Sequence, residues 1–161
     1  MIRPVEEKDV PALTAIYNHY ITETTATFET EPISEDEMAE RVKAITAEGP
    51  YLVDEEDGKV VGYIYAHKWH ERAAYAKTFE VTEYLAQGYT HHGIGTALLE
   101  QLLILCRQQG LHALVACITA ENTPSRKMYE KNGFQQVSLF KEVGYKFGRW
   151  LDVSDYERIL S

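Results

Sequence analysis

The sequence predicts a single domain with a mixed α/β fold, and three observations lead to this prediction. Segments typical of strands and helices follow one another in the order strand, two helices, three strands, and then helices flanked by strands. Every connection is short, and no linker or internal repeat interrupts the chain. A chain of 161 residues can bury about two-thirds of its unfolded surface around one core. We therefore expect a central mixed sheet covered by helices.

A short first strand at residues 1–5 precedes two amphipathic helices. Asp9 suits the N-cap of the first helix, and Pro11 lies in its first turn. The second helix begins at a capping box made by Ser34 and Glu37. Apolar residues at helical spacing give each helix a buried face: Val10, Leu13, Ile16, Tyr17 and Tyr20 in the first, and Met38, Val42 and Ile45 in the second.

Six further segments are expected to form strands, because they are short, apolar and bounded by turn residues. They are residues 51–53, 59–67, 78–85, 114–118, 134–143 and 145–153. Asp57 and Gly58 join the first pair as a hairpin, and the last pair turns near Gly144. The unbroken apolar run at 114–118 predicts a strand that is buried on both faces.

A turn with two glycines, Gly93 and Gly95, joins the strand at 78–85 to a long amphipathic helix. The start of a helix leaves several backbone N–H groups unpaired at the positive end of the helix dipole, where a phosphate or diphosphate can bind. The alternative is that the glycines only shape the turn. A later helix is expected to begin at Thr123, with Pro124 in its first position.

The composition excludes several classes of function. A net charge of -9 argues against a nucleic-acid-binding protein, which usually has a basic stripe. No run approaches the ~20 apolar residues of a membrane span, and the first residues contain no apolar signal-peptide core. Cys106 and Cys117 lie in apolar segments without metal-ligand spacing, so we interpret both as reduced, buried residues and expect no metal site. We predict a cytoplasmic protein that binds neither membranes nor nucleic acid.

Several motifs, in their order and spacing, resemble the GNAT superfamily of N-acetyltransferases. They are residues 80–95, Asn122 through Phe134, and further segments at 16–21, 28–32, 62–63, 69–75 and 144–153. Within that superfamily the chain is most similar to the phosphinothricin and methionine sulfoximine N-acetyltransferases. The resemblance implies one GNAT domain over residues 1–161, with about six to seven strands and about four helices, that acts as a homodimer on a small-molecule amine.

The resemblance also implies that acetyl-CoA is the co-substrate. Its binding residues would be Glu83, Tyr84, Leu85, Thr90, His91, His92, Gly93, Ile94, Gly95, Thr96, Asn122 and Ser125. The backbone of residues 83–85 would pair with the pantetheine arm, and Arg126 would reach a phosphate. The family loop reads Q/R-x-x-G-x-G/A, and Thr90 replaces its leading residue, so weaker binding is expected. Glu83 stands where relatives have an aliphatic residue, and we expect it to face solvent or a partner chain.

Two residues match the catalytic positions of the family. Glu80 would be the general base that removes a proton from the amine, for which a raised pKa is expected. Alternatively, Glu80 is a strand residue paired with Lys77 or Arg72. The Tyr129 hydroxyl would protonate the departing thiolate, or the ring simply packs against the sheet.

For the substrate, a guanidinium suits a carboxylate or phosphinate, which favours Arg72 in the loop that begins at Trp69. Tyr75 and Phe28 would close the apolar sides of the pocket, although Phe28 is otherwise a small core anchor. Lys146 and Arg149 are further cationic candidates.

Three functions follow from these residues. The first is direct acetyl transfer, in a ternary complex, to the α-amine of a small amino acid or analogue. The second is acetylation of a peptide or protein N-terminus, and the third is a non-catalytic acyl-CoA-binding module.

Overall fold

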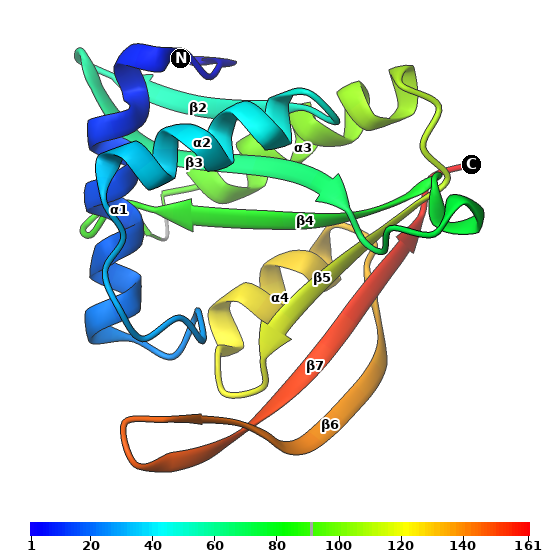
Figure 1. Ribbon diagram of the computed structural model, residues 1–161. Helices are drawn as coiled ribbons and strands as arrows, with labels where there is room; N and C mark the ends of the chain where they lie inside the picture. Colours follow the sequence, from blue (N-terminus) through cyan, green and yellow to red (C-terminus); the bar gives the residue numbers. More distant parts are fainter. Residues whose placement is uncertain (91) are drawn as a thin grey trace.

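The computed structural model describes residues 1–90 and 92–161, and it confirms the mixed α/β fold (Figure 1). The strands are β1 (Ile2–Pro4), β2 (Tyr51–Glu56), β3 (Lys59–Lys68), β4 (Thr78–Leu85), β5 (Ala113–Thr119), β6 (Gln135–Lys146) and β7 (Arg149–Ile159). The helices are α1 (Val10–Glu23), α2 (Glu35–Thr46), α3 (Ile94–Gln108) and α4 (Thr123–Lys131). The strands form one seven-stranded sheet in the order β1-β2-β3-β4-β5-β7-β6.

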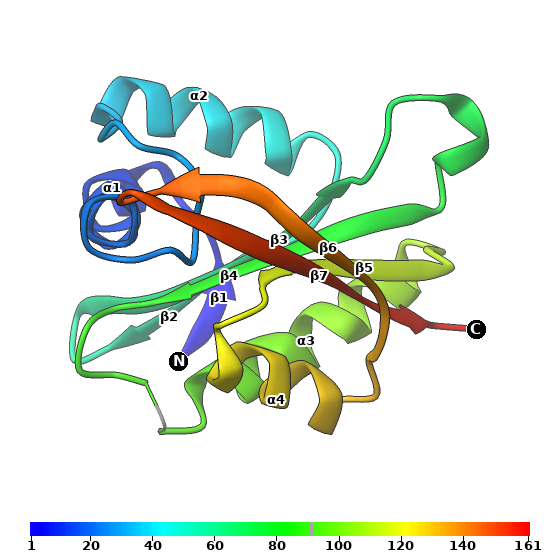
Figure 2. The same ribbon diagram turned by 90° about the horizontal axis from the view of Figure 1, so that it is seen from below.

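Helices cover both faces of this sheet, α1 and α2 on one face and α3 and α4 on the other (Figure 2). Strand alternation sends side chains to the two faces in turn, which creates two apolar cores. Ile64, Phe79 and Val81 pack with α3 and α4, whereas Tyr51, Val53 and Tyr63 pack with α1 and α2. Successive side chains of β4 therefore point alternately into the two cores.

Among the strand pairs in the described part of the chain, only β4–β5 is parallel, and it is short. Its register runs from Thr78↔Ala113 to Val81↔Ala116, although β4 continues to Leu85 and β5 to Thr119. The two strands diverge beyond that point (Figure 1). The second half of β4 therefore has an edge without a neighbouring strand on its β5 side, and such an edge can pair with an extended ligand.

Four local predictions were wrong in detail. The carboxylate of Asp9 does not cap α1; it accepts the Glu6 N–H and pairs with Arg3. The side chain of Asn122, one residue before the expected cap, accepts the Ser125 N–H and caps α4. The Ser34 hydroxyl does accept the Glu37 N–H, so that half of the capping box is present.

The last hairpin turns at Phe147 and Gly148, both of which have positive φ, as a two-residue hairpin turn requires. Gly144 instead lies inside β6, at an irregularity in the β6–β7 register. A Cβ at this position would overlap the ring of Phe28, so the glycine leaves space for that ring.

The fourth error concerns Cys117, which is exposed and not buried. Leu114, Ala116 and Ile118 face the core beneath α3 and α4, so Cys117 points to the opposite face. There the divergence of β4 and β5 leaves it uncovered. Cys106 is buried in α3, as expected. None of the helices in the described residues is long and apolar enough to cross a membrane.

Candidate active site

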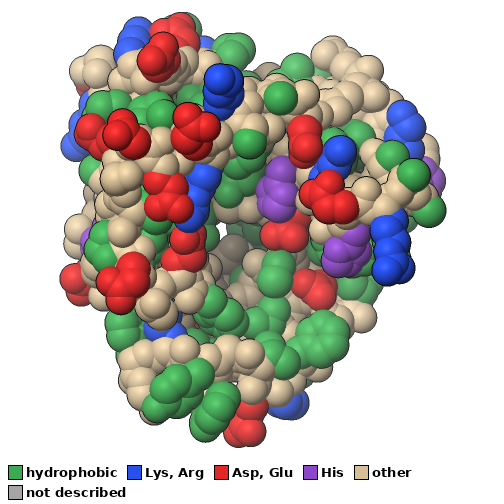
Figure 3. All heavy atoms as spheres, in the orientation of Figure 1, with side chains coloured by type: hydrophobic (Ala, Val, Ile, Leu, Met, Phe, Trp, Pro, Cys, Tyr) green, Lys and Arg blue, Asp and Glu red, His purple; other side chains and the backbone are tan. Residues whose placement is uncertain are grey.

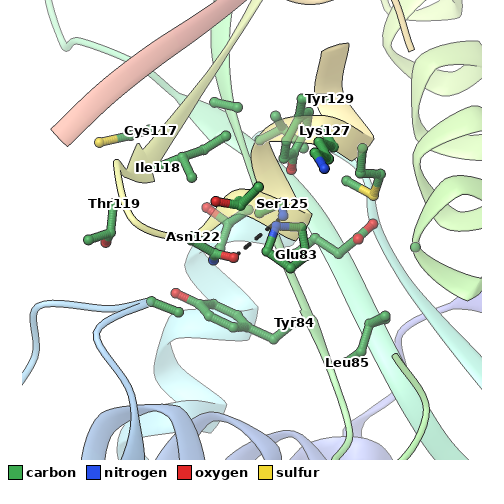
Figure 4. Close-up of a pocket in the computed structure, with 18 of the residues that line it drawn as sticks. Glu83, Tyr84, Leu85, Cys117, Ile118, Thr119, Asn122, Ser125, Lys127 and Tyr129 are labelled. Atoms are coloured by element: carbon green, nitrogen blue, oxygen red, sulfur yellow. Dashed lines mark hydrogen bonds between the residues drawn. The ribbon is translucent and has the colours of Figure 1, made fainter. Parts of the chain in front are cut away.

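A cavity of about 1030 Å³ lies at the opening between β4 and β5. Residues from α1, β4, β5, β7, α4 and the first turn of α3 line it. The surface is hollowed near the centre of the face that Figure 1 presents (Figure 3). Figure 4 shows how the lining side chains of β4, β5 and α4 are arranged, with Asn122 bonded to the Ser125 backbone. The volume is at the upper end of the usual range for small-molecule sites, roughly 300–1,000 Å³.

Most of the residues predicted from the sequence line this one cavity. They are Phe28, Glu80, Glu83, Tyr84, Leu85, Thr90, Gly93, Gly95, Thr96, Asn122, Ser125 and Tyr129. His92 is exposed and does not line it, and neither does Ile94. His91 lies outside the described residues.

The first turn of α3 has the geometry of an anion site. Gly93 is the N-cap and has a φ of 79°, a left-handed conformation that favours glycine. Gly95 is in close contact with β4 and α4, because an added Cβ would lie 2.6 Å from Glu83 Oε1 and 3.0 Å from Met128 Sδ. The unpaired N–H groups of this turn can therefore be approached closely by a phosphate.

Two lysines, Lys127 and Lys131, line the cavity from α4 and bring positive charge to it. Neither lysine was predicted from the sequence. Their four-residue spacing, which places both on one side of a helix, was the available signal. Arg126, the residue predicted to reach a phosphate, instead donates to the Tyr156 hydroxyl and to the carbonyl of Ala120. The cationic contribution of α4 thus comes from its lysines.

Glu80 lies on the α1–α2 face of β4, opposite His67 on β3. Its Oε2 is 3.8 Å from His67 Nε2, so neither Lys77 nor Arg72 is its partner. Burial raises the pKa of Glu80 above its ordinary value, and nearby Asp155 adds to this effect, whereas His67 opposes it. The Glu80 side chain is still 29% exposed, so it can both receive a proton from a ligand and release it to water.

Replacing His67 with glutamine is expected to raise the pKa of Glu80. Protonated His67 lowers the pKa of Glu80, and the variant loses this effect. Because the pair is partly exposed, the pKa of Glu80 should rise by less than about one unit. NMR titration of the Glu80 side-chain carboxyl carbon in both proteins measures this change. An unchanged pKa in the variant would show that His67 does not act on this carboxylate.

Tyr129 lies on the opposite side of the opening, in α4. Its side chain is only 3% exposed, and its ring packs edge-on against Phe134 at a centroid distance of 5.0 Å. Burial raises the pKa of the Tyr129 hydroxyl well above its ordinary value. The phenol therefore keeps its proton at neutral pH and is available as a proton donor.

Cys117 is on the same face as Glu80 and also lines the cavity. Although the cavity exposes it, surrounding protein atoms desolvate the sulfur, and burial with help from Asp155 and Glu80 raises the pKa of the thiol to about 12. The group is a neutral thiol at pH 7. This makes Cys117 a poor nucleophile, because the thiolate is the reactive form.

The remaining cationic candidates, Lys146 and Arg149, form hydrogen bonds within the protein. Lys146 is buried, and its Nζ donates to the carbonyl of Thr27 at 2.8 Å, which fixes the loop that carries Phe28. Arg149 forms a bidentate pair with Glu121.

Phe28 itself lines the cavity, so the loop after α1 forms part of the cavity wall.

Three predicted substrate residues lie outside this wall. The β3–β4 pairing continues to Lys68↔Phe79, so the loop from Trp69 to Tyr75 projects beyond the end of the sheet. There the Trp69 and Tyr75 rings pack edge-on at 5.4 Å, and Arg72 is exposed just before the short 3₁₀ turn Ala73–Tyr75. The structure does not bring this loop together with Phe28.

Comparisons with known proteins agree with this geometry. A family model described as an acetyltransferase (GNAT) domain matches residues 2–154. The phosphinothricin N-acetyltransferase of Alcaligenes faecalis is 40% identical over 162 residues, which are 99% of this chain and 82% of that protein. The L-methionine sulfoximine/L-methionine sulfone acetyltransferase of Salmonella typhimurium is 33% identical over 154 residues, 95% of this chain and 90% of that protein.

Solved structures are similar over the whole chain. A GNAT superfamily phosphinothricin acetyltransferase from Sinorhizobium meliloti, in complex with AcCoA, matches with a TM-score of 0.97 at 36% identity, covering 100% of this chain and 88% of that one. A ribosomal-protein-alanine N-acetyltransferase from Brucella melitensis matches with a TM-score of 0.96 at 32% identity, covering 99% of both chains.

Proposed function

Because the chain belongs to the acetyltransferase (GNAT) family, we propose that it transfers an acetyl group from acetyl-CoA to the α-amine of a small amino acid or analogue of the phosphinothricin or methionine sulfoximine type. One observation carries the proposal. The cavity at the β4–β5 opening has a carboxylate, Glu80, on one face of the sheet and a buried phenol, Tyr129, on the other. Amine acetylation needs a proton acceptor and a proton donor arranged in this way.

The residues present fit acetyl-CoA. The free edge of β4 at residues 82–85 can pair with the extended pantetheine arm of acetyl-CoA through its amide groups. The turn before α3, together with Lys127 and Lys131 in the cavity lining, can bind the phosphates of acetyl-CoA. At Gly95 a side chain would clash with Glu83 and Met128, so the glycine lets the first turn of α3 pack closely against β4 and α4. Acetyl-CoA, when bound, supplies an acetyl group activated as a thioester.

The protein's own residues then account for the proton movements. Glu80 takes a proton from the substrate ammonium, directly or through one water, so that the amine can attack. Tyr129 gives its hydroxyl proton to the departing sulfur. The neutral thiol of Cys117 favours direct transfer in a ternary complex over a covalent acetyl-protein.

A thiol-release assay with acetyl-CoA and a panel of acceptors tests the function. We expect turnover with amino acids and analogues, including phosphinothricin and methionine sulfoximine. Turnover only with peptides that carry a free N-terminus would refute this proposal and favour acetylation of peptide or protein N-termini. The similarity to the Brucella melitensis structure supports that alternative. Acetyl-CoA binding without turnover on any amine would leave a binding module.

We further propose that residues 1–161 act as one catalytic domain and assemble as a homodimer in the cytoplasm, where acetyl-CoA is used. Strands from Ile2 to Ile159 share one sheet, which supports the single domain. A row of exposed apolar side chains on β6, β7 and their turn supports the dimer: Val137, Leu139, Phe140, Val143, Tyr145, Phe147 and Trp150. Sedimentation equilibrium measures the mass in solution, and a monomer would refute the assembly.

A further inference from the structure

The side chain of Glu83 is the feature that the proposed reaction leaves unused. The expectation that it faces solvent or a partner chain was wrong, because β4 places it on the α3–α4 face, opposite Ile64 of the apolar core. Its side chain lines the cavity, and Oε2 is the one buried side-chain oxygen or nitrogen in residues 1–90 and 92–161 without a hydrogen-bond partner. Buried polar atoms are almost always paired, so this one needs an explanation.

The groups packed around Glu83 do not supply the missing partner. Gly95 of α3 is in close contact with it and has no side chain to offer. The titratable groups facing the same cavity are Tyr20 of α1, Glu80 and Tyr84 of β4, Cys117 of β5, and Lys127, Tyr129 and Lys131 of α4. Within the described residues, none of them forms a hydrogen bond with Glu83 Oε2. Burial raises the pKa of Glu83 well above its ordinary value, which favours the protonated form of the carboxyl group.

We propose that the carboxyl group of Glu83 is a binding residue for acyl-CoA, donating its O–H to a carbonyl of the extended arm at the β4–β5 opening. The inference rests on the proposed function, because it assumes that acyl-CoA occupies this cavity. Glu83 lies just beyond Val81, the last residue of β4 that pairs with β5, so its side chain reaches the arm where the free edge begins. An amide or thioester carbonyl offers the acceptor that the free protein lacks.

Ionisation of Glu83 would oppose the same ligand. A carboxylate has no proton to donate, and it would place a negative charge beside Gly95, at the turn suited to phosphates. Acetyl-CoA affinity should therefore fall as the pH rises through the ionisation of Glu83. The free energy of unfolding should also fall with pH above about 4.3, because the folded protein keeps a proton that the unfolded chain releases.

Two variants separate binding from packing. Glu83→Met has nearly the same length but no donor, and Glu83→Gln keeps a donor that cannot ionise. Isothermal titration with acetyl-CoA should show a Kd about 3- to 10-fold weaker for Glu83→Met near neutral pH. The same variant should unfold at higher urea concentration, because an unpaired buried polar group has been removed. Glu83→Gln should bind like the unaltered protein at about pH 6 and lose less affinity by about pH 9.

A higher stability together with a weaker affinity for acetyl-CoA in Glu83→Met would indicate a binding role, because a purely structural role predicts no loss of affinity. A Glu83→Met protein that binds acetyl-CoA as tightly as the unaltered protein would overturn the inference, as would identical pH profiles of Kd for the unaltered protein and Glu83→Gln. Glu100→Gln removes one charge from an exposed position of α3 and is the matched control. Absence of acetyl-CoA binding by the unaltered protein would overturn the proposed function as well, so the two failures are distinguishable.

Discussion

Replacing Glu80 with glutamine is expected to lower kcat by about 10²- to 10⁴-fold, the usual contribution of a general base. Glutamine has nearly the same shape but cannot accept the proton of an ammonium group. Glu80 lies on the face of β4 opposite the turn before α3, so the Kd for acetyl-CoA should stay within about twofold. Steady-state kinetics with a reactive acceptor, together with titration calorimetry, measure both quantities.

The pH dependence provides a second test of this role. Glu80 acts as a base only when ionised, and burial raises its pKa, so the rate of the unaltered protein should fall as the solution becomes mildly acidic. The glutamine variant should lose this acidic limb. Activity of the unaltered protein that stays constant from neutral to mildly acidic pH would remove Glu80 as the base.

Replacing Tyr129 with phenylalanine is expected to lower kcat by about 10²-fold or more, because the departing sulfur loses its proton donor. The ring itself packs against Phe134, and phenylalanine preserves that contact. The thermal midpoint should therefore change by only a few degrees, roughly the effect of 1 kcal/mol. Stopped-flow measurement of thiol release with a saturating acceptor isolates the chemical step.

The choice of thioester supplies a control for Tyr129. A thiol that is more acidic than that of CoA leaves readily without protonation. With an acetyl thioester of such a thiol, the rates of the unaltered protein and Tyr129→Phe should converge. An equal loss with both thioesters would show that the hydroxyl positions the substrate and does not donate a proton.

The sequence predicted the parts of the site that depend on local patterns. The glycines before α3, the strand that carries Glu80 and the helix that carries Tyr129 were all placed correctly, because turn chemistry and periodicity are local properties. The capping residue of α4 was one position off. Either Asn122 or Thr123 can accept a hydrogen bond at a helix start, and only the backbone geometry decides between them.

The errors share a tertiary cause. The sequences of β4 and β5 contain no local signal that their pairing stops after Val81 and Ala116. This divergence of the two strands exposes Cys117 and places Glu83 at a cavity. Similarly, the sequence offered Lys146 as a cationic candidate for the substrate, whereas the structure buries it. Its burial depends on the Thr27 carbonyl, 119 residues away in the sequence.

The alternation of side chains along β4 limits the insertions and deletions that this strand can accept during evolution. Glu80 and Glu83 are three positions apart and point to opposite faces of the sheet. A single-residue insertion or deletion between them would send one of the two carboxyl groups to the wrong face. Residues 80–83 therefore cannot accept a change of length, whereas the Trp69–Tyr75 loop, which projects beyond the sheet, can accept insertions and deletions.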